Sequence, residues 1–98
     1  SKTAYQEAVT AREEAESAAA QAKEKLTKLE TQLSNLQTQL QNATTDTKKA
    51  SIQEKIDAKQ AEITTAKSDS ETKSAALETA QKTENFKESF AKRLLFAR

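Results

Sequence analysis

The sequence LTKLETQLSNLQTQL, residues 26–40, places a leucine at every third or fourth position. The same spacing continues toward the N-terminus through smaller side chains. The whole line consists of Tyr5, Ala8, Arg12, Ala15, Ala19, Ala22, Leu26, Leu29, Leu33, Leu36, Leu40 and Ala43. Steps that alternate between three and four residues form the seam of a left-handed coiled coil. The pattern therefore predicts one long helix over about residues 3–42, with Arg12 as the only charged residue in its seam.

A second seam follows a break at about residues 42–47, where Asn, Thr and Asp side chains favour turns over helix interior. Its apolar members are Ile52, Ile56, Ile63, Ala66, Leu77 and Ala80, and the same frame contains Lys59, Ser70 and Lys73. Continued past Ala80, this frame would bury Glu84 and Lys87. We expect the apolar face to shift there to a stripe made of Ala76, Ala80, Thr83, Phe90, Leu94 and Ala97, with Phe86 beside it. The second helix is predicted over about residues 48–97, with Thr45, Asp46 or Thr47 as its N-cap.

Folding the chain back at the break pairs residues whose numbers add up to about 89. Large aliphatic side chains then meet near the turn, as in Leu26 opposite Ile63, and small ones meet away from it. We therefore predict an all-α fold, an antiparallel coiled-coil hairpin, as a single domain over residues 1–98. In this register Arg12 reaches Glu78 or Glu84, and Tyr5 lies opposite about Glu84.

The alternative fold is a three-helix bundle. Ser68 and Glu71 have the spacing of a capping box, which could open a third helix. No Gly or Asn precedes them to end the helix before. The hairpin is therefore the preferred prediction.

Composition narrows the classes of function. The chain has no His and no Cys, which removes the usual soft metal ligands and thiol nucleophiles. We therefore predict a non-enzymatic protein without a cofactor, a metal site or catalytic residues. The formal net charge is +1, whereas nucleic-acid binders usually carry a basic stripe, so no nucleic-acid partner is expected. Two helices with one thin seam bury little apolar surface, so we expect self-association or a protein partner.

The C-terminal segment FKESFAKRLLFAR, residues 86–98, differs from the rest of the chain. It holds three of the four aromatic residues and four basic residues against one Glu. Its candidate contact residues are Phe86, Phe90, Lys92, Arg93 and Leu94. Three interpretations stay open: a core segment that closes the end of the hairpin, a face that docks a protein, or a helix on an anionic membrane surface. The membrane surface is the least favoured.

Two runs resemble a known family. They are AAAQAKEKLTKLETQLSNL (18–36) and IDAKQAEITTAKSDSETKSAAL (56–77), separated by a break with Thr and Asp. Together they resemble the coiled-coil region of the hydrophobic translocators of bacterial type III secretion, whose antiparallel helices precede membrane-inserting segments. The resemblance implies a secreted bacterial protein, so a secreted or cell-surface location is expected ahead of a cytoplasmic one. Helical hairpins of receptor-binding bacteriocins and of surface proteins look similar.

These observations predict a structural or protein-interaction module that acts as a rigid spacer or a docking surface. The alternative is a coiled-coil segment of a secreted translocator or toxin that engages a membrane or a receptor. The residues expected to hold the coiled coil together are Leu26, Leu29, Leu33, Leu36, Leu40, Ile52, Ile56 and Ile63.

Overall fold

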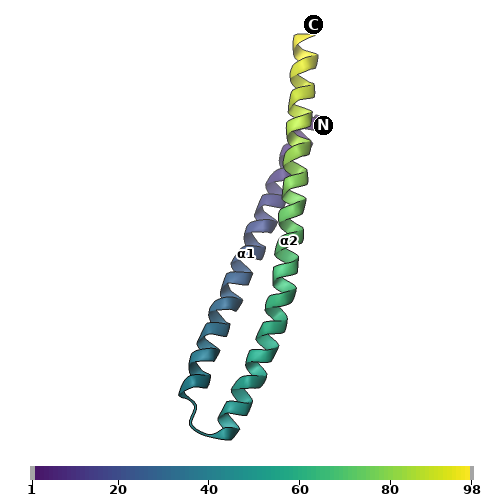
Figure 1. The fold of residues 1–98 in the computed structure, drawn as a ribbon. Coiled ribbons are helices and arrows are strands. Elements are labelled where there is room, and N and C mark those ends of the chain that lie inside the picture. Colours follow the sequence, from purple (N-terminus) through teal and green to yellow (C-terminus); the bar gives the residue numbers. More distant parts are fainter. Residues whose placement is uncertain (1, 98) are drawn as a thin grey trace. The chain divides into compact units, whose positions relative to one another are not determined.

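The computed structural model describes residues 2–97 and contains two helices, α1 (Ala4–Asn42) and α2 (Asp46–Phe96). The helices run antiparallel and form a hairpin, and no strand occurs among the described residues (Figure 1). The predicted all-α hairpin is confirmed. The three-helix bundle is wrong, because α2 continues without a break through Ser68 and Glu71.

The helix starts are closed by threonine side chains. At the start of α1, the Gln6 backbone N–H donates to Thr3 Oγ1 (3.1 Å), and the Thr3 N–H donates to Gln6 Oε1 (3.0 Å). This reciprocal pair is a capping box. At the start of α2, the Lys48 N–H donates to Thr45 Oγ1 (3.2 Å). Thr45 is therefore the N-cap, and α2 begins two residues earlier than the predicted position 48.

The chain divides into two compact units, and each is described by itself. The turn unit, Ala22–Ser70, contains the end of α1, the linker and the first part of α2. The terminal unit contains the described residues up to Gln21 and those from Glu71 onward.

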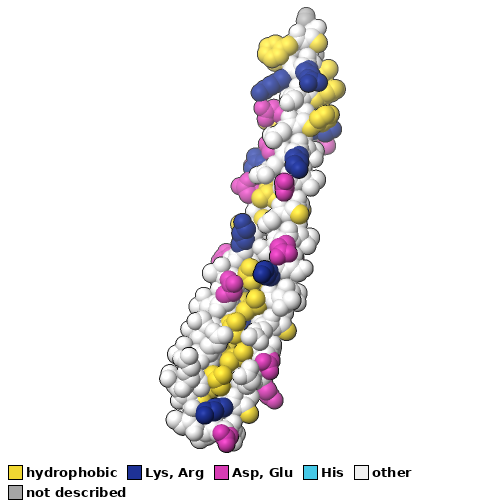
Figure 2. All heavy atoms as spheres, viewed as in Figure 1, with side chains coloured by type: hydrophobic (Ala, Val, Ile, Leu, Met, Phe, Trp, Pro, Cys, Tyr) yellow, Lys and Arg dark blue, Asp and Glu magenta, His cyan; other side chains and the backbone are white. Residues whose placement is uncertain are grey.

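The turn unit has an aliphatic seam between its two helix segments. Ala22, Leu29, Ile56 and Ala66 are buried. The remaining predicted seam residues are half-buried, namely Leu26, Leu33, Leu36, Leu40, Ile52 and Ile63. Figure 2 shows a continuous line of hydrophobic side chains there. Two polar residues of the frame lie in this unit, Lys59 and the buried Ser70. Lys59 is half-buried and donates from Nζ to Gln32 Oε1 (2.9 Å) and Glu62 Oε2 (3.2 Å). Its aliphatic stem can cover the seam while the ammonium group stays hydrogen-bonded.

The terminal unit keeps the same frame beyond Ala80, contrary to the predicted shift. Leu77, Ala80, Glu84 and Lys87 are half-buried, and Ala8 and Ala19 are buried on α1. The stripe that was expected to replace this frame is exposed at Ala76, Thr83, Phe86, Phe90, Leu94 and Ala97. The physical reason is an ion pair, since Arg12 on α1 supplies the opposite charge that lets Glu84 lie in the seam.

Candidate functional site

The exposed large side chains near the end of α2 form the candidate site. Phe86, Phe90 and Leu94 follow one another at four-residue steps, which places them on one face of the helix. They are 67%, 52% and 57% exposed, respectively. We call these three residues the aromatic face. Figure 2 shows hydrophobic side chains in this region, with Lys and Arg side chains beside them. The interpretation of this segment as a buried closure of the hairpin is therefore wrong.

A forked ion pair fixes α2 just before the aromatic face. Arg12 donates from Nε to Glu84 Oε2 (2.7 Å) and from Nη2 to Glu84 Oε1 (3.4 Å). Its Nη1 also donates to Glu16 Oε2 (3.2 Å). The hydrogen bond that Arg12 donates to Glu84 is the main cause that raises the pKa of Arg12 above its usual range. Two parallel hydrogen bonds add geometric specificity to the charge attraction. The ion pair therefore fixes which side of α2 faces α1.

A second cluster lies one turn further along the same side of α2, which faces α1. Glu88 accepts hydrogen bonds from Lys92 Nζ (2.9 Å) and from the Tyr5 hydroxyl (3.5 Å). The hydrogen bond from Lys92 lowers the pKa of Glu88, and the same bond raises the pKa of Lys92. Tyr5 thus lies one helical turn further along α2 than predicted. With Ala91 and Leu95, these side chains line a groove of about 240 Å³.

Two basic side chains accompany the aromatic face. Lys87 Nζ lies 5.9 Å from the centre of the Phe86 ring, within the range of a cation–π interaction. Arg93 lines a small groove of about 70 Å³ together with Phe86, Ser89 and Phe90. Within residues 2–97, neither Lys87 nor Arg93 forms a salt bridge. The face therefore combines exposed apolar rings with two cations that lack a carboxylate partner.

The structure brings together four of the five candidate contact residues. Phe86, Phe90, Leu94 and Arg93 lie on or beside the aromatic face, whereas Lys92 turns to Glu88 and Tyr5. Sequence reasoning omitted Lys87 from the candidates. Its position directly after Phe86 was the available signal, because a cation next to an exposed ring can lie over it.

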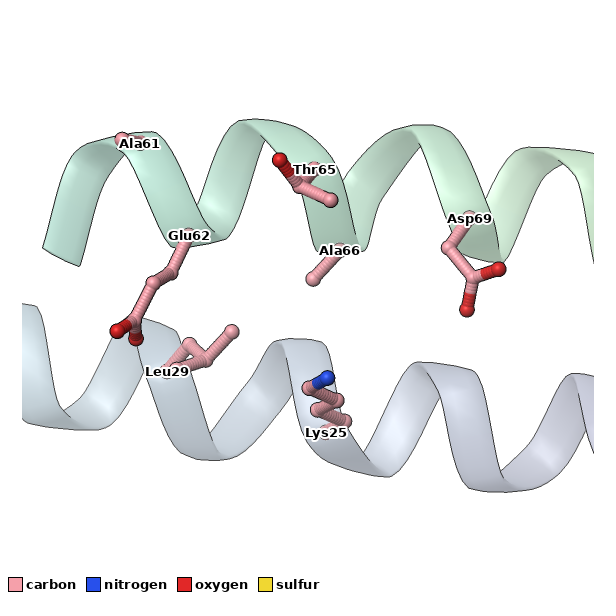
Figure 3. A pocket seen from close by; sticks show the side chains of 7 residues that line it. All are labelled: Lys25, Leu29, Ala61, Glu62, Thr65, Ala66 and Asp69. Carbon is pink, nitrogen blue, oxygen red and sulfur yellow. The ribbon is translucent and has the colours of Figure 1, made fainter.

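Another groove lies in the turn unit and has a volume of about 670 Å³. It is lined by Lys25, Leu29, Ala61, Glu62, Thr65, Ala66 and Asp69. Figure 3 shows Leu29 and Ala66 between the two helices and Glu62 reaching toward α1. The lining mixes the seam residues Leu29 and Ala66 with charged side chains from both helices.

Neither a metal centre nor a membrane span emerges from the part of the chain that the structure describes. No group of three or more potential ligands among His, Cys, Asp and Glu occurs within residues 2–97. In the same range, neither helix is long and apolar enough to cross a bilayer. The candidate site described above is a surface made of apolar rings and cations.

Comparison with known proteins finds no matching family model, no similar curated protein and no similar solved structure. The function is accordingly inferred from the chain's own residues. The resemblance to the secretion translocators stays a prediction.

Proposed function

We propose that this chain is a non-enzymatic coiled-coil module that presents the aromatic face to a protein partner. The observation that carries the proposal is the exposure of Phe86, Phe90 and Leu94. The aliphatic residues of the seam between α1 and α2 in the turn unit are, by contrast, buried or half-buried. A contiguous exposed apolar patch on a small protein usually marks an interaction site.

The apolar area supports a modest affinity. A phenylalanine side chain contributes ~200 Å² when fully exposed, so the two rings at positions 86 and 90 leave about 240 Å² in water. At about 25 cal/mol per Å², covering them would release about 6 kcal/mol before the costs of association. Those costs are of similar size, at ~4–15 kcal/mol. A partner must therefore contact more of α2 than the two rings alone.

The remainder of the hairpin acts as the spacer that holds this face. The seam of the turn unit and the Arg12–Glu84 ion pair each fix α2 against α1 within their own unit. A preorganised surface loses less conformational entropy on binding than a flexible segment does. The coiled coil thus favours docking without forming part of the contact.

Site-specific photocrosslinking in the source cells tests the proposal. The photoreactive residue p-benzoylphenylalanine replaces Phe90, and a matched chain carries it at exposed Gln60 in the turn unit. We expect position 90 to give a discrete adduct with another polypeptide, whereas position 60 gives none. Equal adducts at both positions, or none at position 90, would contradict the proposal.

A second candidate function is engagement of a membrane surface by a segment of a secreted bacterial translocator or toxin. Lys87 and Arg93 favour it, because cations beside an apolar helix face attract anionic lipids. Co-sedimentation of the intact chain with vesicles that contain phosphatidylserine tests this candidate. Binding that is lost in Phe90→Ala would support it, and no binding of the unaltered chain would remove it.

A further inference from the structure

We infer that the aromatic face belongs to a second coiled-coil seam on α2, and that its partner is an acidic amphipathic helix of another polypeptide. The inference rests on the proposed docking function and specifies the chemistry of the partner.

The first step is the spacing of the exposed stripe. Its members alternate three- and four-residue steps from Ala76 to Phe90, and the same steps then pass through Arg93 to Ala97. They are Ala76, Thr79, Thr83, Phe86, Phe90, Arg93 and Ala97, all of them exposed. From Ala76 to Phe86, each lies one residue before a half-buried residue of the frame that faces α1. One residue corresponds to about 100° around a helix, so α2 carries two seams side by side.

The spacing indicates the shape of the partner. A stripe with strict three- and four-residue steps is the narrow seam into which another helix inserts its side chains. A helix that lies on a lipid surface needs a broad apolar face instead. Upstream of Phe86 the stripe has only small side chains and is bordered by Lys82, which forms a surface ion pair with Glu78 (3.5 Å). Leu94, Leu95 and Phe96 widen the exposed apolar surface only at the end of α2. The narrow stripe upstream of Phe86 therefore favours a helix over a membrane.

The charge next to the stripe indicates the chemistry of the partner. Residues 86–97 contain Lys87, Lys92 and Arg93 against Glu88, which gives a net charge of +2. The Lys92–Glu88 pair is satisfied internally, so Lys87 beside the stripe and Arg93 within it remain available. Charges at the flanks of a coiled-coil seam select its partner, and a polar residue within a seam fixes its register. Two copies of this segment would bring like charges together, whereas acidic flanks on a partner helix would neutralise them.

The length of the stripe sets the size of the partner. From position 76 to position 97 it extends for ~33 Å at 1.5 Å per residue. A partner of about three heptads covers this length. It would bury the two rings and Leu94 near one end and pack against small side chains along the rest.

Two synthetic peptides of three heptads serve as probes. Both have Leu at the seam positions a and d; one has Glu and the other Lys at the flanking positions e and g. Like-charge repulsion keeps each peptide from pairing with itself. Binding to the intact chain is measured by fluorescence anisotropy. We expect the Glu peptide to bind at least tenfold more tightly than the Lys peptide and to weaken as salt is added.

Three variants assign the binding to the aromatic face. In Phe86→Ser/Phe90→Ser the Glu peptide should lose at least tenfold in affinity. In Lys87→Glu/Arg93→Glu the preference should reverse toward the Lys peptide, a gain that unfolding does not produce. The matched control Lys55→Glu/Lys67→Glu makes the same charge change at exposed positions of the turn unit and should leave the preference unchanged.

The outcomes separate this inference from the proposed function. Equal affinity for the two peptides, or no binding of either, overturns the acidic helix. Sedimentation equilibrium and vesicles with phosphatidylserine are run in parallel on the unaltered chain and on Phe86→Ser/Phe90→Ser. If the variant loses only self-association, the partner is a second copy of the chain. If it loses only vesicle binding, the partner is a membrane. In both cases the aromatic face remains a binding surface. If the variant changes none of the measurements, the inference and the proposed docking function both fail.

Discussion

Truncation of Ile56 to alanine should cost about 2 kcal/mol of unfolding free energy. Ile56 is 4% exposed, so nearly all of the removed surface is buried in the folded chain. The change deletes three carbon atoms at ~0.8 kcal/mol each, or about 2.4 kcal/mol. Alanine has a higher helix propensity than isoleucine, which offsets a few tenths of a kcal/mol of this loss in unfolding free energy. Because the seam lies between only two helices, neighbouring groups and water can close around the deletion. The cost should therefore stay near the lower end of the ~2–5 kcal/mol range for such truncations.

Urea unfolding followed by circular dichroism at 222 nm measures this cost. With a slope near ~1 kcal/mol per molar urea, the midpoint should fall by about 2 M. The matched control is Phe86→Ala, which deletes a larger side chain that is 67% exposed. We expect that variant to remain within about 0.5 kcal/mol of the unaltered chain. A loss at Phe86 as large as the loss at Ile56 would refute the assigned frame, because it would mean that the aromatic face is packed.

Three further predictions concern single contacts. Arg12→Glu should lower the thermal midpoint of unfolding, because it places a carboxylate against Glu84. Adding Glu84→Arg to this variant should restore much of the midpoint. If the effects of the two substitutions on the midpoint simply add, the result would argue against the ion pair. Thr45→Ala should lower the unfolding free energy in urea by about 1 kcal/mol through loss of the N-cap, and an unchanged midpoint would contradict that role. The lowered pKa of Glu88 stabilises the fold above the carboxyl's unfolded pKa, and this stability is lost as pH falls through the folded pKa. In Lys92→Gln the carboxyl resonance of Glu88 should therefore titrate at higher pH by NMR.

The first helix and its seam could be predicted from the sequence because one spacing accounts for all of the leucines in that helix. Every predicted seam residue from Tyr5 to Ala43 is buried or half-buried. The N-cap was narrowed to three positions, since Thr and Asp have similar capping preferences. Only the packed backbone selects Thr45 among them.

The second half of α2 could not be predicted from its own residues. Two heptad frames, one residue apart, run through it after position 76, and the frame with Phe86 and Phe90 is the more apolar. A reading by hydrophobicity alone therefore chooses the wrong frame to face α1. The sequence correctly predicts that Phe86 and Phe90 share one face of the helix. The prediction that this face packs against α1 is wrong, because both side chains are exposed.

The choice between the two frames depends on Arg12, which lies on the opposing helix. If α2 turned its more apolar frame toward α1, Glu84 would leave the seam and the Arg12 guanidinium would remain there without the carboxylate that now accepts two of its hydrogen bonds. Arg12 would then keep only its exposed partner Glu16 (3.2 Å). A single polar seam residue specifies register at some cost in stability. The frame that faces α1 therefore keeps the Arg12–Glu84 ion pair in the seam and leaves Phe86 and Phe90 exposed. One charged residue near the start of the chain then decides two properties: which side of α2 packs within the hairpin, and which side is left for a partner.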